Sequence, residues 1–142
     1  MIWHTKISLE TLNQFGNVNM MKHLAIEFTE IGEDFLIAKM PVDTRTQQPM
    51  GLLHGGASVV LAETLGSTAA NLCIDNAGFY ALGLEVNANH IRSVSEGFVY
   101  GITRPIHLGR STQIWAIEIT DEEGKKVCIS RITMAVMERD KA

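Results

Sequence analysis

The chain has 142 residues, of which 46% are hydrophobic and 20% are charged, and its formal net charge at pH 7 is −4. This length suits one domain spanning residues 1–142, and the acidic balance excludes a general attraction to nucleic acids or acidic membranes. The charged start of the chain and the absence of an apolar run of about eighteen residues predict neither a signal peptide nor a membrane span, so we expect a cytoplasmic protein.

A short helix and a hairpin are predicted before residue 43. Ser8 is a good N-cap for a helix over Leu9 to Phe15, and Gly16 would end it. The following segments have the pattern of a strand, a turn and a second strand: 24–29, 31–34 and 35–42. A polar loop over residues 43–51 then leads into the next element.

Residues 51–75 form a largely apolar run of helix length that opens with His54-Gly55-Gly56. On a helix that turns about 100° per residue, one arc of roughly 180° carries aliphatic and small residues that can lie on a sheet. The opposite arc carries Glu63, with Ser67 one turn further on. A polar face that meets water is the ordinary interpretation. A lone carboxylate in the middle of an apolar run favours a functional one.

The start of this helix offers a second feature. The first N–H groups of a helix have no partner within it, the helix dipole makes that end positive, and Gly55 and Gly56 leave their N–H groups open to a ligand. Glu63 lies eight residues after Gly55, which is about 12 Å along the axis. One helix cannot easily bring both to the same carbonyl group, whereas two antiparallel copies can. We therefore expect a site shared between two subunits.

The rest of the chain predicts four long strands joined by short turns. The turn at 75–78 follows the helix, and Asp121-Glu122-Glu123-Gly124 has the composition of a hairpin turn. The strands are expected over about 80–91, 97–107, 112–121 and 125–137. A long helix with a hairpin before it and a meander after it is an α+β layout.

Cysteines and histidines give no sign of a metal site. Cys73 and Cys128 lie in apolar contexts without a CxxC or His–Cys ligand spacing, and we expect buried free thiols in a reducing compartment. His4, His23 and His107 have no metal-like spacing with one another or with a carboxylate, so no metal is predicted.

The strings QQPMGLLHGGASVVLAETLGS, LEVNANHIRS and HLGR resemble the hotdog-fold acyl-CoA thioesterases. They are most similar to the branch that includes the 1,4-dihydroxy-2-naphthoyl-CoA thioesterase of menaquinone synthesis and the proofreading thioesterase of enterobactin synthesis. The glutamate-using 4-hydroxybenzoyl-CoA and phenylacetate-pathway thioesterases are more distant. The resemblance extends from about Ile7 to Met137 without a departure at the catalytic positions. It implies one long helix wrapped by an antiparallel sheet of five to six strands, and a homotetramer built as a dimer of dimers.

The resemblance also implies a set of catalytic residues. Thioester hydrolysis needs an activated water or a carboxylate nucleophile, and a group that stabilises charge on the carbonyl oxygen. Glu63 takes the first role, as general base or as nucleophile through a mixed anhydride, and the sequence leaves both open. The Gly55 N–H of the neighbouring subunit takes the second role. Gln48 would orient the water or the thioester, and His54 would support the substrate or the loop.

The implied substrate-binding residues surround this group: Ser67, Gly56, Asn89, His90, Arg92 and Arg110. His90, Arg92 and Arg110 are candidates for the phosphates of coenzyme A, since arginine matches phosphate geometry. Ser67 would touch the acyl group or the carboxylate. Each residue alone also has an ordinary structural explanation, such as a loop amide, tight packing or a solvated charge.

The expected substrate is an aromatic acyl-CoA or an aryl-carrier-protein thioester, with 1,4-dihydroxy-2-naphthoyl-CoA as a candidate. Coenzyme A is then part of the substrate, and no separate cofactor is expected. Two alternatives remain. A hotdog dehydratase or hydratase would pair a catalytic histidine with a carboxylate in other motifs. A non-catalytic acyl-CoA-binding module would have no need for Glu63.

Overall fold

Alternating apolar residues in the strands and an apolar stripe on the long helix build two faces that pack on each other. The computed structural model describes residues 1–140. The helices are α1 (Leu9–Gly16), α2 (Asn19–His23) and α3 (Gly55–Leu72). The strands are β1 (Glu27–Ile31), β2 (Leu36–Pro41), β3 (Phe79–His90), β4 (Phe98–Leu108), β5 (Thr112–Thr120) and β6 (Lys126–Glu138).

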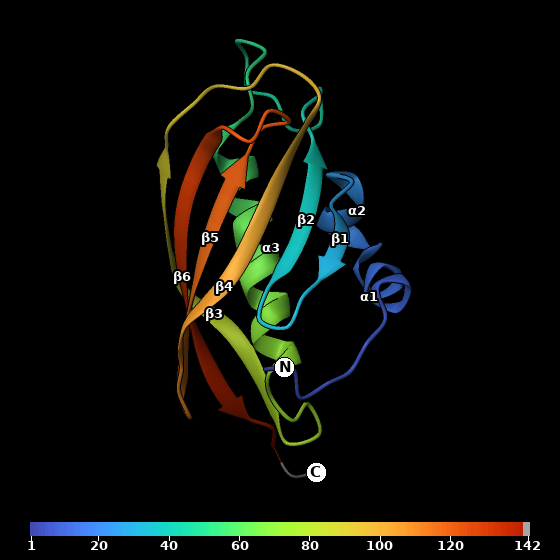
Figure 1. The fold of residues 1–142 in the computed structure, drawn as a ribbon, viewed down its shortest axis with the longest axis vertical. Helices are drawn as coiled ribbons and strands as arrows, with labels where there is room; N and C mark the ends of the chain where they lie inside the picture. The colour runs from blue at the N-terminus through green and yellow to red at the C-terminus, as the bar shows by residue number, and fades with distance from the viewer. Residues whose placement is uncertain (141–142) are drawn as a thin grey trace.

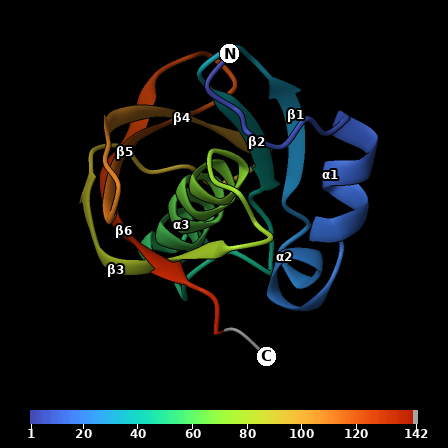
Figure 2. The same cartoon turned by 90° about the horizontal axis from the view of Figure 1, so that it is seen from below.

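The six strands form one antiparallel sheet in the order β1-β2-β4-β5-β6-β3. Figures 1 and 2 show that this sheet curves around α3, while α1 and α2 lie outside it beside β1. The predicted α+β layout, with one long helix wrapped by an antiparallel sheet, is therefore confirmed. None of the helices within residues 1–140 has the length and apolarity to cross a membrane.

The core lies between α3 and the concave face of the sheet. Leu61 and Leu65 of α3 are fully buried, as are Trp115 and Ile117 of β5. Gly66 permits close approach of the helix, because a Cβ at this position would come within 2.5 Å of Cγ2 of Ile132 in β6. Burying side chains of this size stabilises a fold by about 1.5–3 kcal/mol each. The buried face is the aliphatic arc predicted for this helix, and Glu63 lies on the exposed face as expected.

The first strand begins later than predicted, and a short helix precedes it. Residues 19–23 form α2, and β1 starts at Glu27 instead of residue 24. Asn19 and Ala25 adopt the left-handed region, with φ of 54° and 52°, and so separate α2 from its neighbours. A helix of five residues is too short to produce a helical repeat in the sequence. The apolar alternation that begins at Leu24 therefore looked like the start of a strand.

Asparagine side chains from two helices cover the two edges of the sheet. Asn13 of α1 bonds both the N–H and the C=O of Phe28 in β1, at 2.8 Å each. Asn71 of α3 does the same for Ala81 near the start of β3, at 2.9 and 3.1 Å. Beyond Ala81, β3 continues to His90, paired with β6 on one side and with no strand of residues 1–140 on the other. The sheet thus has an open edge along most of β3.

The two cysteines are free, as predicted. Cys128 is buried, whereas Cys73, the C-cap of α3, is only half-buried. The expectation of a buried thiol was therefore wrong for Cys73, which packs against the core only from its border. Burial raises the pKa of the Cys73 thiol to about 12, and it also raises the pKa of Cys128.

Candidate active site

The N-terminus of α3 presents one main-chain donor. His54 is the N-cap, and its Nδ1 accepts a hydrogen bond from the Gly56 N–H at 2.8 Å. The Gly55 N–H has no acceptor within residues 1–140. Since Gly56 is already bound, only Gly55 keeps a main-chain N–H for a ligand. Helix geometry alone left Gly55 and Gly56 equivalent, because it does not show which way the His54 ring turns.

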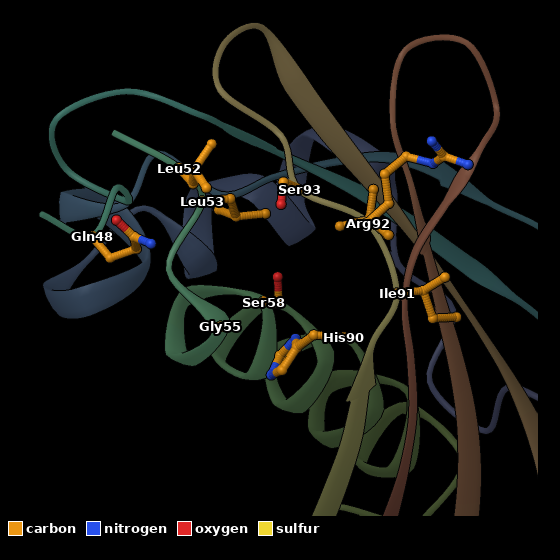
Figure 3. A pocket seen from close by; sticks show the side chains of 10 residues that line it. Gln48, Leu52, Leu53, Gly55, Ser58, His90, Ile91, Arg92 and Ser93 are labelled. Carbon is orange, nitrogen blue, oxygen red and sulfur yellow. The ribbon is translucent and has the colours of Figure 1, made fainter. Parts of the chain in front are cut away.

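A pocket of about 300 Å³ opens in front of this N–H group. Figure 3 shows Gln48, Ser58 and His90 around the first turn of α3, with Arg92 nearby. The pocket therefore combines four of the predicted site residues, Gln48, Gly55, His90 and Arg92, which come from the loop before α3, from α3 itself and from the end of β3. Pockets of this size are suitable for part of a small-molecule ligand.

The loop that carries Gln48 is held by its own hydrogen bonds. The buried Thr46 donates from Oγ1 to the C=O of Pro41 at 2.7 Å, and its own C=O accepts the His54 N–H at 2.8 Å. The Gln48 N–H donates to the Leu52 C=O at 2.8 Å. The Oε1 atom of Gln48 accepts the Met50 N–H. The side-chain amide group of Gln48 is then left to donate into the pocket.

An ion pair lies at the start of the same loop. The Arg45 guanidinium donates to the Asp43 carboxylate at 2.6 to 3.2 Å. These side-chain hydrogen bonds lower the pKa of the Asp43 carboxyl below its ordinary value. Both side chains are substantially exposed, so the pair orders the loop more than it stabilises the fold.

His90 lies beside the start of α3. A Cβ at Gly55 would come within 2.7 Å of His90 Nε2, so the ring occupies the space next to the helix terminus. Arg92 follows two residues later, exposed at the same pocket. Asn89 is exposed and does not line this pocket, because side chains alternate between the two faces of a strand.

Glu63 lies elsewhere, on the exposed face of α3 near its midpoint. Its Oε1 lies against Gly83 of β3, where a Cβ would come within 2.6 Å of that oxygen. Glu63 and Ser67 line a second groove of about 320 Å³ together with Met20 and Met21 of α2. Within one chain, therefore, Glu63 does not line the pocket that holds the Gly55 N–H, as the length of the helix predicted.

Arg110 lies in the turn between β4 and β5, away from the pocket at Gly55. Along the paired strands, Gly83 is opposite Met134, and Met134 is opposite Gln113, which comes three residues after Arg110. His90 pairs with Cys128, at the other end of the same strands. The residues expected to bind coenzyme A are thus separated within one chain. His90 and Arg92 lie at the pocket of Gly55, whereas Arg110 lies nearer to the end of the sheet that contains Gly83, against which Glu63 lies.

Two contributors to the site were missed from the sequence. Ser58 is a buried polar residue that lines the pocket in the first turn of α3. Gly83 provides the space in which the Glu63 carboxylate lies. A glycine inside an apolar strand pattern commonly marks a close approach, so Gly83 was detectable. Among residues 1–140, no group of three His, Cys, Asp or Glu side chains is arranged to hold a metal ion.

Residues 50–128 match the family model described as the Thioesterase superfamily. The chain belongs to this family. It is 56% identical over 137 residues to the 1,4-dihydroxy-2-naphthoyl-CoA hydrolase of Escherichia coli, covering 96% of this chain and 100% of that protein. It is 52% identical to a proofreading thioesterase, EntH, of Cronobacter turicensis, covering 96% of this chain and 99% of that protein.

Solved structures agree with this membership. A mutant thioesterase from Pseudomonas aeruginosa superposes with a TM-score of 0.96 at 48% identity, covering 98% of this chain and 100% of that chain. A thioesterase from Haemophilus influenzae gives a TM-score of 0.94 at 48% identity, covering 97% and 96% of the two chains. The hotdog fold is therefore confirmed, and the protein is a thioester hydrolase.

Proposed function

We propose that this thioesterase hydrolyses aromatic acyl-CoA esters at a site that two copies of the chain build together. Glu63 of one copy would act on the thioester carbonyl, and the Gly55 N–H of the other would bind the carbonyl oxygen. The observation that carries this proposal is that two functional groups of one helix lie in separate cavities of the same chain. The unpaired Gly55 N–H lies in one cavity and Glu63 lies in another.

The open edge of β3 supports the pairing of two copies. An unpaired edge strand is a template for another strand, and Asn71 covers only its start at Ala81. If two β3 strands pair about a twofold axis, they extend the sheet and set the two α3 helices antiparallel. The first turn of each helix then approaches the middle of the other.

The chemistry follows from the two groups. As general base, Glu63 takes a proton from a water molecule, whose oxygen adds to the carbonyl carbon. The tetrahedral intermediate expels coenzyme A as the thiolate, which receives the proton. As nucleophile, the Glu63 carboxylate instead adds to the carbonyl carbon and displaces coenzyme A as the thiolate. Water then hydrolyses the resulting mixed anhydride, which frees the acid and regenerates the carboxylate, and a proton from that water passes to the thiolate. In both cases the Gly55 N–H would stabilise the oxyanion, a role typically worth about 10²- to 10³-fold in rate.

The pocket at Gly55 is suited to the thioester and the coenzyme. The Gln48 amide would donate to the water or to the thioester, and His54 would hold the helix terminus through its bond to Gly56. His90 and Arg92 border the same pocket, where Arg92 would bind phosphate. Arg110, nearer the level of Glu63, would reach a coenzyme held by the other copy.

The acyl group is proposed from the relatives. The Escherichia coli relative is named for a bicyclic aromatic acyl-CoA, 1,4-dihydroxy-2-naphthoyl-CoA, and we propose the same class of substrate here. The EntH relative is named for proofreading, so an aryl-carrier-protein thioester is the alternative form of the substrate. Rates on matched aryl-CoA and aryl-carrier-protein esters, read as released thiol, would decide between them.

The Glu63→Gln variant tests the carboxylate. We expect turnover of an aromatic acyl-CoA to fall by several orders of magnitude while binding is retained, since the amide keeps the shape but neither accepts a proton nor attacks. Glu30→Gln, at an exposed position of β1, is the matched control and should keep parental activity. Parental activity in Glu63→Gln would refute the mechanism.

The Gly55→Pro variant tests the main-chain donor. Proline is well tolerated at the first position of a helix, and His54 has the extended ψ of 129° that a following proline requires. The variant therefore removes the N–H with little change to the helix. Gly55→Ala is the control, because it adds a similar Cβ next to His90 but keeps the N–H. We expect Gly55→Pro to lose about 10²-fold more activity than Gly55→Ala.

Mixing subunits tests whether the site is shared. Glu63→Ala and Gly55→Pro proteins are each strongly impaired on their own in this mechanism. In a mixed dimer, one site carries both defects and the other carries none, so co-refolded protein should regain about a quarter of parental activity. No recovery, with mixed dimers demonstrated by mass, would contradict a shared site.

A further inference from the structure

The groove that holds Glu63 continues along α3. Met20 and Met21 border it at Glu63. A neighbouring groove of about 380 Å³ shares Met21, Ser67 and Thr68 with it and extends towards the end of the helix. The two grooves adjoin at these three residues, and together they are defined here as the acyl trough, which begins at Glu63 and passes beside the α1–α2 segment.

The α2 helix contributes little to the core, and Met21 packs against it only from the border. None of its five residues is buried, and Met20 is 60% exposed. The helix is set apart by left-handed backbone at Asn19 and Ala25, which is uncommon for an alanine. Strained backbone of this kind clusters at functional sites. The methyl group of Met21 packs near Gly16 of α1, where a Cβ would come within 2.9 Å of it. The segment thus holds Met20 exposed and Met21 half-buried beside the trough.

We propose that Met20 and Met21 form the apolar wall of the acyl-group site and set its preference for flat, multi-ring aromatic acyl groups. This inference rests on the proposed function, because Glu63 fixes where the thioester carbonyl lies. From that carbonyl, the acyl group would extend into the acyl trough. Methionine is flexible and makes favourable contacts between its sulfur and aromatic rings. Short or small acyl groups would not reach both side chains.

Selectivity among acyl groups provides the test. The probes are acetyl-CoA, benzoyl-CoA and 2-naphthoyl-CoA, and the measurement is kcat/KM from released thiol. Met20→Ala should lower kcat/KM for 2-naphthoyl-CoA by about tenfold or more, since a lost apolar contact of this size is worth about 10- to 200-fold. Acetyl-CoA should change by less than about twofold, because it does not reach position 20.

The control is Lys22→Ala. Lys22 belongs to the same helix but lines a different depression, together with polar side chains of α1. We expect this variant to keep the parental rates on all three substrates. A loss of selectivity in Lys22→Ala as large as that in Met20→Ala would show that the whole helix, and not its methionines, is responsible, and would overturn the proposal.

Binding separates this inference from the hydrolytic mechanism. A naphthylmethyl thioether of coenzyme A, which cannot be hydrolysed, should bind Met20→Ala about tenfold more weakly than the parent, whichever role Glu63 plays. Equal binding, or an equal loss for all three esters, would refute the methionine wall. Dissociation of Met20→Ala into monomers would refute it too, since Met20 would then be an interface residue. A parent that hydrolyses none of the esters but binds the thioether more tightly than Met20→Ala would refute the proposed function alone.

Discussion

Gly83 of β3 lies directly against the carboxylate of Glu63, so close that a Cβ at position 83 would come within 2.6 Å of Oε1. The Glu63 carboxylate of α3 therefore occupies the volume that a side chain at position 83 of β3 would need. The register of β3 shifts between Gly83 and Glu85, so this contact lies beside a β-bulge. Bulges often occur next to active sites, where they redirect a side chain. The path of β3 thus determines where the proposed catalytic acid lies.

Gly83→Ala should reduce activity without unfolding the protein. The added methyl group meets the end of a flexible side chain, so Glu63 moves aside at little cost in free energy. A displacement of about 1 Å at a reacting group can cost about 10²-fold in rate, and we expect a loss of this order in kcat. The free energy of unfolding should change by less than about 1 kcal/mol.

Gly78→Ala is the control for this variant. A Cβ at Gly78 would meet no atom within 4 Å, so neither activity nor stability should change measurably. Urea titrations and steady-state rates on the two alanine variants check both quantities. Unchanged kcat in Gly83→Ala would mean that the position of Glu63 does not limit the reaction.

Substitution of His54 should separate capping from catalysis. His54→Ala removes the acceptor of the Gly56 N–H, and the loss of such a cap costs about 0.5–2 kcal/mol. His54→Asn restores a capping oxygen and should recover most of this stability. If kcat recovers together with stability, His54 acts through the helix terminus. If stability recovers alone, the imidazole contributes directly to the reaction.

Asn71→Leu should lower both stability and activity. It removes the side-chain partners of the N–H and C=O of the buried Ala81, and an unsatisfied buried polar group costs about 1–3 kcal/mol. It also releases the start of β3, two residues before Gly83. Asn13→Leu makes the same change at the opposite edge of the sheet. That variant should lose stability in the same range, since it leaves the N–H and C=O of the buried Phe28 without partners.

Cys73 should react slowly with thiol reagents in the folded protein. Only the thiolate reacts, and a pKa raised to about 12 by burial leaves about a thousandfold less thiolate at pH 8 than an ordinary cysteine has. Labelling with iodoacetamide at pH 8 should be slow in buffer and fast in urea. The unfolded thiol loses its proton at lower pH than the folded one, so this group's contribution to stability decreases as the pH rises above about 9.

Much of the fold was predictable because its determinants are local. The apolar arc of α3, the alternation in β3 to β6 and the Ser8 cap, which accepts the Thr11 N–H at 3.1 Å, are all properties of short segments. The α2 helix was missed because its limits are set by the backbone at Asn19 and Ala25. Asparagine is enriched in the left-handed region without being specific to it, and alanine rarely adopts it. The strand start predicted at residue 24 was wrong for the same reason.

The candidate site also has features that the local sequence determines and features that depend on tertiary contacts. The sequence by itself determined the residue types, the glycine-rich helix start and the distance between Gly55 and Glu63, because helix geometry is fixed by residue spacing. Only the tertiary structure decided that His54 binds the Gly56 N–H, that His90 lies beside Gly55 and that Gly83 receives the Glu63 carboxylate. These contacts join segments that are distant in the chain or depend on the rotation of a side chain, and neither is encoded in a local pattern.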